Sequence, residues 1–345
     1  FKALEKITVE GEVLDASGQL VTDFTGIVNP TVKDSKVTVT CLKNSNKDDS
    51  PAFTFTDYPN TIFIGNDSVR NGKFSFTFTV PKDISYSNLQ GKMNLYAVDT
   101  ESGNEAQGNF DNFIVGGTSD TAETDTIGPE IRALYLNDTT FMDGGQVNTT
   151  PYFVAELWDK SGVNITGSSV GHDMMLVIDE STVLSYNLNS YYELLPGEDG
   201  TGIVKFPIPA LEPGKHTAEF WVWDILNNST VRTFTFEVVE GLKPFLFDVI
   251  ATPGIAREQV TFHLMHNRPE SRMRVGIMVY DLAGRQLWKH EESGTSGLFE
   301  NYTVSWDLTS GGARMRPGVY IYRAAISTDN SKDATKARKF IILGE

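Results

Sequence analysis

The sequence predicts an all-β fold, and three of its features support this. Apolar residues recur at every second position in many short runs, which places them on one face of a strand. Gly, Asn, Asp and Pro separate these runs at short intervals, as they do between the strands of sandwich proteins. No amphipathic helical pattern extends over more than ten residues. Together these features indicate consecutive β-sandwich domains of the immunoglobulin-like kind.

Individual runs show the two-residue period clearly. Residues 37–41 alternate Val, Val and Cys with Thr, so Cys41 is expected on the apolar face of a strand. Residues 74–80 alternate Phe and Val with Ser and Thr, and residues 234–238 follow the same pattern. The run Phe-Trp-Val-Trp at 220–223 is apolar on both faces, which is typical of a strand inside a sandwich.

The length and two polar linkers predict three domains. A chain of 345 residues at roughly 100–150 residues per domain holds two or three of them. Residues around 116–129 are small and polar, and a Gly-Leu-Lys-Pro stretch begins at residue 241. We therefore expect β-sandwich domains at 1–126, 127–241 and 242–345, each the size of one sandwich.

Charge and composition limit the possible functions. Residues 1–241 hold 15 basic and 34 acidic residues, a net charge of −19, whereas residues 242–345 hold 14 and 11, a net charge of +3. The acidity argues against a nucleic-acid or anionic-lipid partner. The change of sign near residue 242 indicates a terminal module with a different role.

A single cysteine excludes a disulfide within the chain, and the start at Phe1 rather than Met predicts a mature product or a part of a longer protein.

Few residues suggest catalysis or metal binding. Cys41 is interpreted as a small core residue because none of the five histidines is near it in sequence. His172 and Asp173 follow Gly171 in what we interpret as a loop or the start of a strand. His263 and His266 would face opposite sides of a strand, which argues against a shared metal. The sequence thus predicts no catalytic site, no metal site and no cofactor.

Acidic loops leave one alternative open. They occur at 120–125, 159–162 and 198–200, and surface turns account for them. Calcium binding is the alternative, although the ligand spacing of an EF-hand loop is absent.

The C-terminal piece carries the most specific motifs. They are Val-Gly-Ile-Met-Val-Tyr-Asp-Leu-Ala-Gly-Arg at 275–285, Trp-Asp at 306–307, Arg-Pro-Gly-Val-Tyr-Ile-Tyr-Arg at 316–323 and Lys-Ala-Arg-Lys-Phe-Ile-Ile-Leu at 336–343. In this order, over about residues 245 to 345, they resemble the type A C-terminal signal domain of type IX secretion cargo in Bacteroidetes. The resemblance implies a small β-sandwich that directs a periplasmic protein through the outer membrane.

The middle piece resembles part of one family within this system. Its motifs, in chain order, lie at 125–131, 143–145, 157–164, 171–173, 188–192 and 223–229. Together they are similar to the region behind the peptidase domain in the type IX secretion sortases, which are gingipain-like cysteine peptidases. The resemblance implies an upstream enzyme that cleaves cargo signal domains and attaches cargo to anionic lipopolysaccharide. The family's catalytic Cys and His belong to that peptidase domain, and no matching motif occurs in this chain.

Two functions remain open on the sequence. The first is a non-catalytic β-domain segment of the sortase, which supports the peptidase domain. The resemblance implies that this segment docks the peptidase to the outer-membrane barrel PorV and other attachment-complex components. The protein would then be peripherally attached to the outer membrane at the bacterial cell surface. The alternative is a secreted adhesin or hydrolase appendage whose signal domain is cleaved during export. They differ in whether the mature surface protein still ends at Glu345.

The candidate docking residues lie at the C-terminal end. An apolar strand follows basic residues there, and the resemblance implies that PorV reads this end by strand or tail recognition. A basic edge strand that prevents aggregation is the structural alternative. The predicted docking residues are Lys336, Arg338, Lys339, Phe340, Ile341, Ile342 and Leu343.

Overall fold

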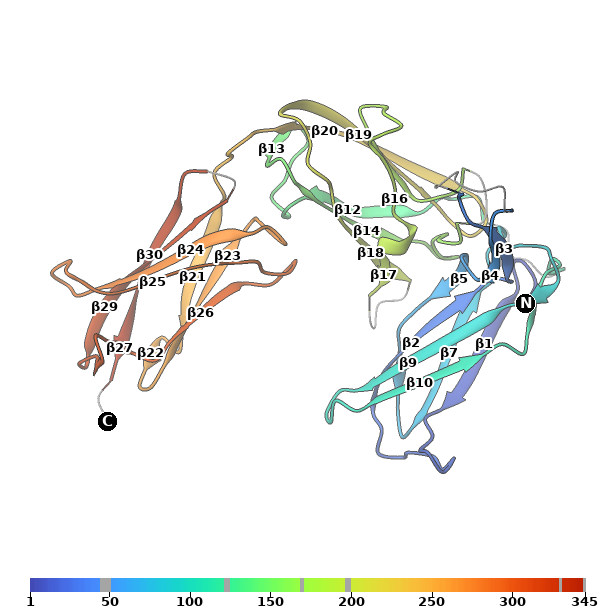
Figure 1. Ribbon diagram of the computed structural model, residues 1–345, viewed down its shortest axis with the longest axis horizontal. Helices are drawn as coiled ribbons and strands as arrows, with labels where there is room; N and C mark the ends of the chain where they lie inside the picture. The colour runs from blue at the N-terminus through green and yellow to red at the C-terminus, as the bar shows by residue number, and fades with distance from the viewer. Residues whose placement is uncertain (44–50, 121–124, 168–170, 196–199, 329–330, 344–345) are drawn as a thin grey trace. The chain divides into compact units, whose positions relative to one another are not determined.

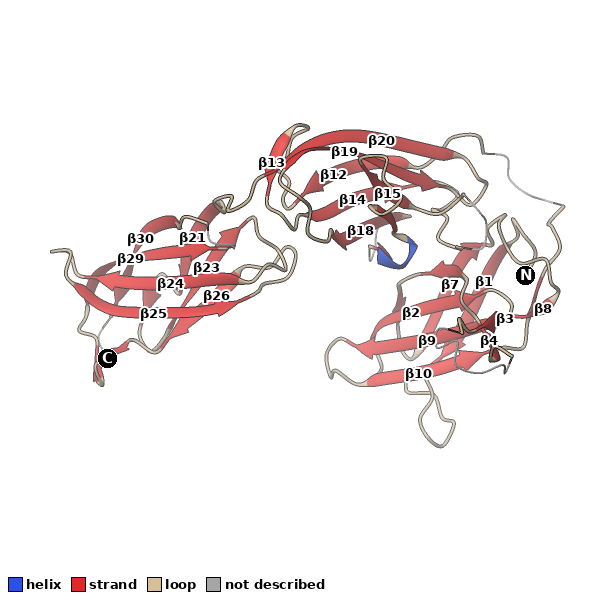
Figure 2. Cartoon of the chain, turned by 45° about the horizontal axis from the view of Figure 1, so that its top comes forward, coloured by secondary structure: helices blue, strands red, loops and turns tan. Residues whose placement is uncertain are grey.

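The computed structural model confirms the all-β prediction of β-sandwiches (Figures 1 and 2). It describes residues 1–43, 51–120, 125–167, 171–195, 200–328 and 331–343. Apart from strands, these residues contain a single turn of 3-10 helix at Asn189–Tyr191, and no helix among them is long and apolar enough to cross a membrane. The chain forms two compact units: Phe1–Leu134 with Val154–Phe206 and Thr217–Phe234, and Tyr135–Phe153 with Pro207–His216 and Thr235–Glu345. The domain boundaries near 126 and 241 stay a prediction.

The N-terminal strands form a sandwich. One sheet has the order β10-β9-β2-β5, with β6 also paired to β2, and β1 pairs with β7. The bounds are β1 Lys6–Glu12, β2 Gly26–Lys33, β5 Thr61–Ile64, β6 Asp67–Val69, β7 Lys73–Thr79, β9 Lys92–Asp99 and β10 Glu105–Phe110. Two smaller pairs join β3 (Val37–Thr40) to β4 (Thr54–Asp57) and β8 (Leu89–Gln90) to β11 (Ile114–Val115).

Strand β7 fills the core of this sandwich as its period predicts. Phe74, Phe76 and Phe78 are at most 9 % exposed. The Ser and Thr residues between them face outward. The ring of Phe63 on β5 stacks on Phe76 and Phe78, with centroids 6.0 and 4.8 Å away. The alternation of 74–80 is therefore confirmed.

Cys41 departs from its prediction. The β3 strand ends at Thr40, and Cys41 lies beyond it and is exposed. The expectation of a buried Cys41 is wrong because β3 and β4 form a two-stranded sheet of their own. None of their described residues belongs to the buried core of the N-terminal sandwich.

The strands of the middle segment form two sheets. Their orders are β12-β14-β18-β17 and β13-β20-β19-β15-β16. The bounds are β12 Glu130–Leu136, β13 Gly145–Val147, β14 Tyr152–Trp158, β15 Met175–Ile178, β16 Ser185–Asn187, β17 Tyr192–Leu194, β18 Thr201–Pro207, β19 Gly214–Trp223 and β20 Ser229–Val238. On β19, Phe220 and Val222 are fully buried while Trp221 and Trp223 are half-buried. Both faces of the strand are therefore largely covered, as the sequence indicated.

The C-terminal strands also form a sandwich. Its main sheets have the orders β21-β23-β26 and β22-β30-β29-β24-β25, and β27 pairs with β28. The bounds are β21 Leu246–Thr252, β22 Ile255–Ala256, β23 Val260–His266, β24 Met273–Tyr280, β25 Gln286–Gly294, β26 Tyr302–Trp306, β27 Thr309–Ser310, β28 Ala313–Arg314, β29 Gly318–Ser327 and β30 Ala334–Ile342.

A cluster of aromatic rings holds β30 in this sandwich. Phe340 is 1 % exposed. The centroids of four rings lie between 5.8 and 6.4 Å from its own, and they belong to Phe262, Trp306, Tyr320 and Tyr322. These rings come from three strands, β23 and β26 in one sheet and β29 in the other, so Phe340 joins the two layers.

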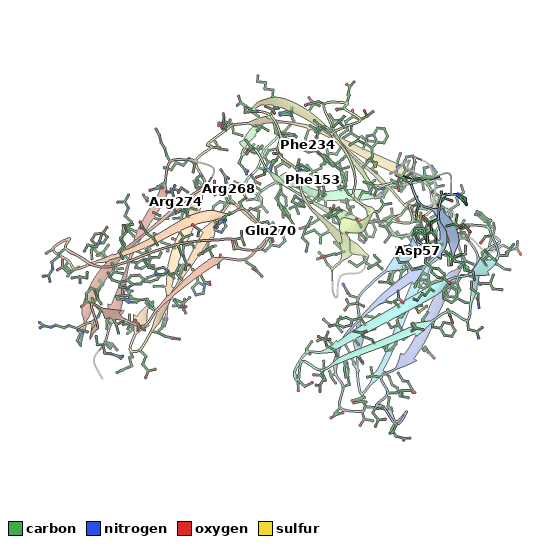
Figure 3. The ribbon with its side chains drawn as sticks, viewed as in Figure 1. Asp57, Phe153, Phe234, Arg268, Glu270 and Arg274 are labelled. Carbon is green, nitrogen blue, oxygen red and sulfur yellow. The ribbon has the colours of Figure 1, made fainter. Side chains whose placement is uncertain are left out.

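A buried arginine fixes the segment that leads into β21 (Figure 3). Arg268 is 1 % exposed, and its Nη2 donates to the carbonyl oxygen of Leu242 at 3.0 Å. Its Nη1 donates to the carbonyl oxygen of Asn267 at 3.0 Å, and Asn267 in turn accepts from the backbone N–H of Phe245 at 2.7 Å. The point where the sequence changes charge is thus anchored by hydrogen bonds.

We expect Phe340→Ala to destabilise the C-terminal sandwich by about 3–5 kcal/mol, the usual cost of removing a buried ring. Lys339→Ala is the matched control, because this neighbouring side chain is exposed and its loss should change stability by less than about 0.5 kcal/mol. Hydrogen exchange of peptides from β29 and β30, followed through a urea titration, measures both. Equal midpoints for the two variants would contradict the packing described.

Candidate functional site

The predicted docking residues lie on or just after β30, and strand alternation divides them between its two faces. Side chains two residues apart share a face, so 336, 338, 340 and 342 point one way and 339, 341 and 343 the other. Phe340 and Ile342 are each 1 % exposed and belong to the core. The seven residues therefore do not form one surface.

The two basic residues on the inner side are engaged within the sandwich. The Nζ of Lys336 donates to the carbonyl oxygen of Phe247. Nε and Nη2 of Arg338 donate to Oδ1 of Asp248 at 3.1 and 2.9 Å. The N–H of Val249 and the Arg338 guanidinium hold the pKa of Asp248 below its usual value. These bonds tie β30 to β21 across the open edge of the sandwich.

The outer face of β30 presents an apolar row that crosses three strands. Ile341 pairs directly with Val319 on β29 and with Ile255 on β22. Ile255 is 55 %, Val319 41 % and Leu343 39 % exposed, and Lys339 is exposed beside them. We call Ile255, Val319, Ile341 and Leu343 the C-terminal apolar row. Sequence reasoning missed Ile255 and Val319 because only the strand pairing brings them next to Ile341.

Comparison with known proteins identifies one similar structure. No family model matches the sequence, and no curated protein matches it significantly. Among solved structures, the crystal structure of dimeric latent PorU from Porphyromonas gingivalis is 38 % identical over 100 % of this chain, with a TM-score of 0.41. The chain is similar to a region of PorU. It spans about a third of that protein, covering 32 % of its length.

Other solved structures share far less sequence. The Ig1-2 module of the Drosophila receptor protein tyrosine phosphatase DLAR is 10 % identical, covering 63 % of this chain and 98 % of that one, with a TM-score of 0.24. The Bacteroides ovatus glucan-utilization protein SGBP-B is 9 % identical, covering 98 % and 64 %, with a TM-score of 0.27. The likeness to PorU is thus distinguished by its sequence identity along the whole chain.

In this PorU-like region, His172 contacts a carboxylate and a tryptophan ring. Nδ1 of His172 lies 2.5 Å from Oδ2 of Asp83, and its ring packs against Trp223 with centroids 4.5 Å apart. His172 thus pairs with a carboxylate and not with the thiol of Cys41. Asp83 also accepts from Nδ2 of Asn227 at 2.8 Å, so this one carboxylate bonds both His172 and Asn227. Sequence reasoning did not single out Asp83.

His266 forms hydrogen bonds through both of its ring nitrogens. Nε2 of His266 bonds Oγ of Ser296 at 2.8 Å, and its Nδ1 accepts the N–H of Arg268 at 3.0 Å. Both ring nitrogens are therefore used within the fold. Burial lowers the pKa of His266 to about 4, which keeps its ring neutral at physiological pH.

Three aspartates form an acidic cluster in the middle segment. One carboxylate oxygen each of Asp125, Asp159 and Asp224 lies within 4.8 Å of the others. Asp159 is 6 % exposed and Asp224 is fully buried. The loop at 159–162 forms the expected turn, but the expectation of a surface carboxylate is wrong for Asp159. Residues 121–124 and 198–199 of the other acidic loops lie outside the described residues.

Each member of the acidic cluster also fixes a turn. Oδ1 of Asp159 accepts the N–H groups of Ser161 and Gly162 at 2.7 and 3.0 Å. Asp224 accepts two bonds from Asn228, through its backbone N–H and its Nδ2, both at 2.7 Å. Carboxylate oxygens suit a hard cation such as Ca²⁺, which fills its remaining positions with carbonyl oxygens and water, so calcium binding here stays a prediction. Turn formation is the role that the hydrogen bonds show.

Burial and mutual repulsion raise two pKa values in the acidic cluster. Burial, with the nearby charges of Asp224 and Asp125, raises the pKa of Asp159 to about 6. Burial also raises the pKa of Asp224. Asp125 differs, since a bond from the N–H of Ile127 lowers its pKa. A raised pKa means that the folded state favours the protonated form.

We therefore expect Asp159→Asn to stabilise the protein more at pH 7.5 than at pH 4. The stability that protonated Asp159 contributes is present below the unfolded pKa near 3.8 and is lost as the pH rises through about 6. Asn keeps the oxygen that accepts the two N–H bonds but carries no charge. The difference between variant and parent should grow by about 2 kcal/mol over this range. Urea unfolding in chelator-treated buffer measures it.

The control for this pH dependence is Asp143→Asn, which has the opposite sign. Oδ1 of Asp143 accepts from the N–H of Thr235 at 2.6 Å and from its Oγ1 at 2.8 Å, and these bonds lower its pKa. Its ionised form therefore stabilises the fold above pH 4, and the loss in this variant should shrink as the pH falls. A flat difference between parent and Asp159→Asn across pH 4 to 7.5 would refute the raised pKa of Asp159.

Proposed function

We propose that this chain is the non-catalytic β-domain segment of a type IX secretion sortase. The observation that supports this most strongly is the 38 % identity to PorU along the whole chain. In this proposal the upstream cysteine peptidase domain cleaves cargo signal domains and attaches cargo to anionic lipopolysaccharide. The β-domains support that peptidase at the bacterial cell surface.

The C-terminal apolar row is the surface proposed to dock this segment to the outer-membrane barrel PorV. Its exposed Ile, Val and Leu side chains gain free energy when a partner removes them from water. Lys339 beside the row and the net charge of +3 over residues 242–345 favour a partner with acidic groups at its rim. The outer-membrane attachment of the whole protein would follow from this contact.

The structure supports recognition of the outer face of β30 rather than donation of the strand. Freeing β30 would expose Phe340 and Ile342, which are each 1 % exposed in the folded sandwich. It would also break the bonds of Arg338 to Asp248. Deleting residues 336–345 would therefore unfold the C-terminal sandwich as well as remove the docking residues. A point substitution on the C-terminal apolar row is the sharper test.

We expect Val319→Asp to lower the amount of barrel that co-purifies by about tenfold or more, because it buries a charge in the proposed interface. Ile250→Asp on β21 is the matched control: Ile250 is 47 % exposed, close to the 41 % of Val319, but lies on the other sheet. Affinity purification of the tagged protein from solubilised outer membranes, followed by quantification of the barrel, measures both. Co-purification that survives Val319→Asp, or that is lost equally in Ile250→Asp, would reject this docking surface.

A further inference from the structure

The β3–β4 hairpin carries apolar side chains on one face. Val39 and Phe55 are direct cross-strand partners, and the N–H of Cys41 donates to the carbonyl oxygen of Phe53 at 2.9 Å, which extends the pairing by one step. We call Val39, Cys41, Phe53 and Phe55 the hairpin apolar face. Phe53 is 71 % and Phe55 40 % exposed, and their rings stack with centroids 6.4 Å apart.

The other face of the hairpin is polar. It consists of exposed threonines at positions 38, 40, 54 and 56. The ribbon is therefore amphipathic, and no residue of its apolar face belongs to the core of the N-terminal sandwich or is among the partly buried residues packed against that core. A two-stranded ribbon is marginally stable alone, and exposed aromatic clusters in soluble proteins mark interaction sites. The hairpin thus has the pattern of an element that packs against something else.

The hairpin begins next to the start of the chain. The N–H of Lys36 donates to the carbonyl oxygen of Gln90 at 3.3 Å, and Gln90 pairs with Ile114. The amino group of Phe1 donates to the carbonyl oxygen of Ile114 at 2.7 Å. Figures 1 and 2 both place the N-terminus beside β3 and β4, and Figure 3 labels Asp57 at the end of β4. Leu89 and Ile114, 45 % and 56 % exposed, add apolar surface here.

We propose that the hairpin apolar face docks onto the polypeptide that precedes Phe1 in the PorU-like protein, which is its upstream peptidase domain. This rests on the proposed function, and it assigns the surface by which the β-domains hold the peptidase. A preceding residue fits, because a backbone amide at Phe1 donates the same bond to Ile114 that its amino group makes. The PorU chain is about three times as long as the part matched here, so ample chain exists to cover the hairpin.

The thiol of Cys41 provides a direct probe of this contact. It is the chain's single cysteine, it is exposed, and it lies on the hairpin apolar face. We expect maleimide to label Cys41 rapidly in the 345-residue chain and slower by about tenfold or more in the full-length protein, since a covered thiol is shielded from reagent. Peptide mass spectrometry isolates the Cys41 signal from thiols elsewhere in the full-length protein.

The matched control places the thiol on the opposite face of the hairpin. Thr38→Cys in a Cys41→Ser background carries it on the threonine face, where labelling should be equally rapid in both proteins. Equal labelling of Cys41 in both proteins would overturn the proposal, as would equal protection of position 38. A third outcome is that Cys41 becomes protected in the 345-residue chain as its concentration is raised, and that light scattering shows dimers. This outcome would assign the hairpin apolar face to a second copy instead.

The proposed function and this inference fail separately. Slow labelling of Cys41 in a full-length protein that lacks peptidase activity would support the docking contact and reject the sortase assignment. Rapid labelling in an active sortase would do the reverse.

Discussion

The packing of Phe340 between the two C-terminal sheets is the interaction on which the core of the C-terminal sandwich and its candidate docking surface both depend. Because strand side chains alternate between faces, fixing Phe340 in the core also fixes the direction of every other residue on β30. Ile342 is buried with it, Arg338 is brought to Asp248, and Ile341 is turned outward. The core and the candidate docking surface are therefore two consequences of one packing contact.

The same alternation determines how far the sequence could predict the fold. It correctly predicted the buried face of 74–80, while the run at 220–223, apolar on both faces, was correctly identified as a strand that is largely covered on both sides. It failed for Cys41, since a two-residue period shows that a strand has an apolar face but not what covers that face. Whether the run at 37–41 joins a sandwich or forms a separate ribbon is decided by strand pairing, which is not local in sequence.

Pairing also explains why the candidate sites were only partly predictable. The seven residues of the C-terminal motif were visible as a sequence run, yet the surface is built across strands, from Ile255, Val319 and Ile341. The acidic cluster likewise joins Asp125, Asp159 and Asp224 from three distant turns. Two of these turns were recognised as acidic loops, but nothing in their composition indicated that Asp159 would be buried beside other carboxylates.

Recognition of β30 through its outer face is tested most directly by hydrogen exchange of the β30 backbone amides, measured in the chain alone and in complex with the outer-membrane barrel. If β30 stays in its own sheet and is recognised through its outer face, the amides of Ala334–Ile342 will exchange slowly and at similar rates in both states. Rapid exchange along β30 in the free chain that becomes slow on binding would contradict this account, because it would show that the strand is donated to the partner.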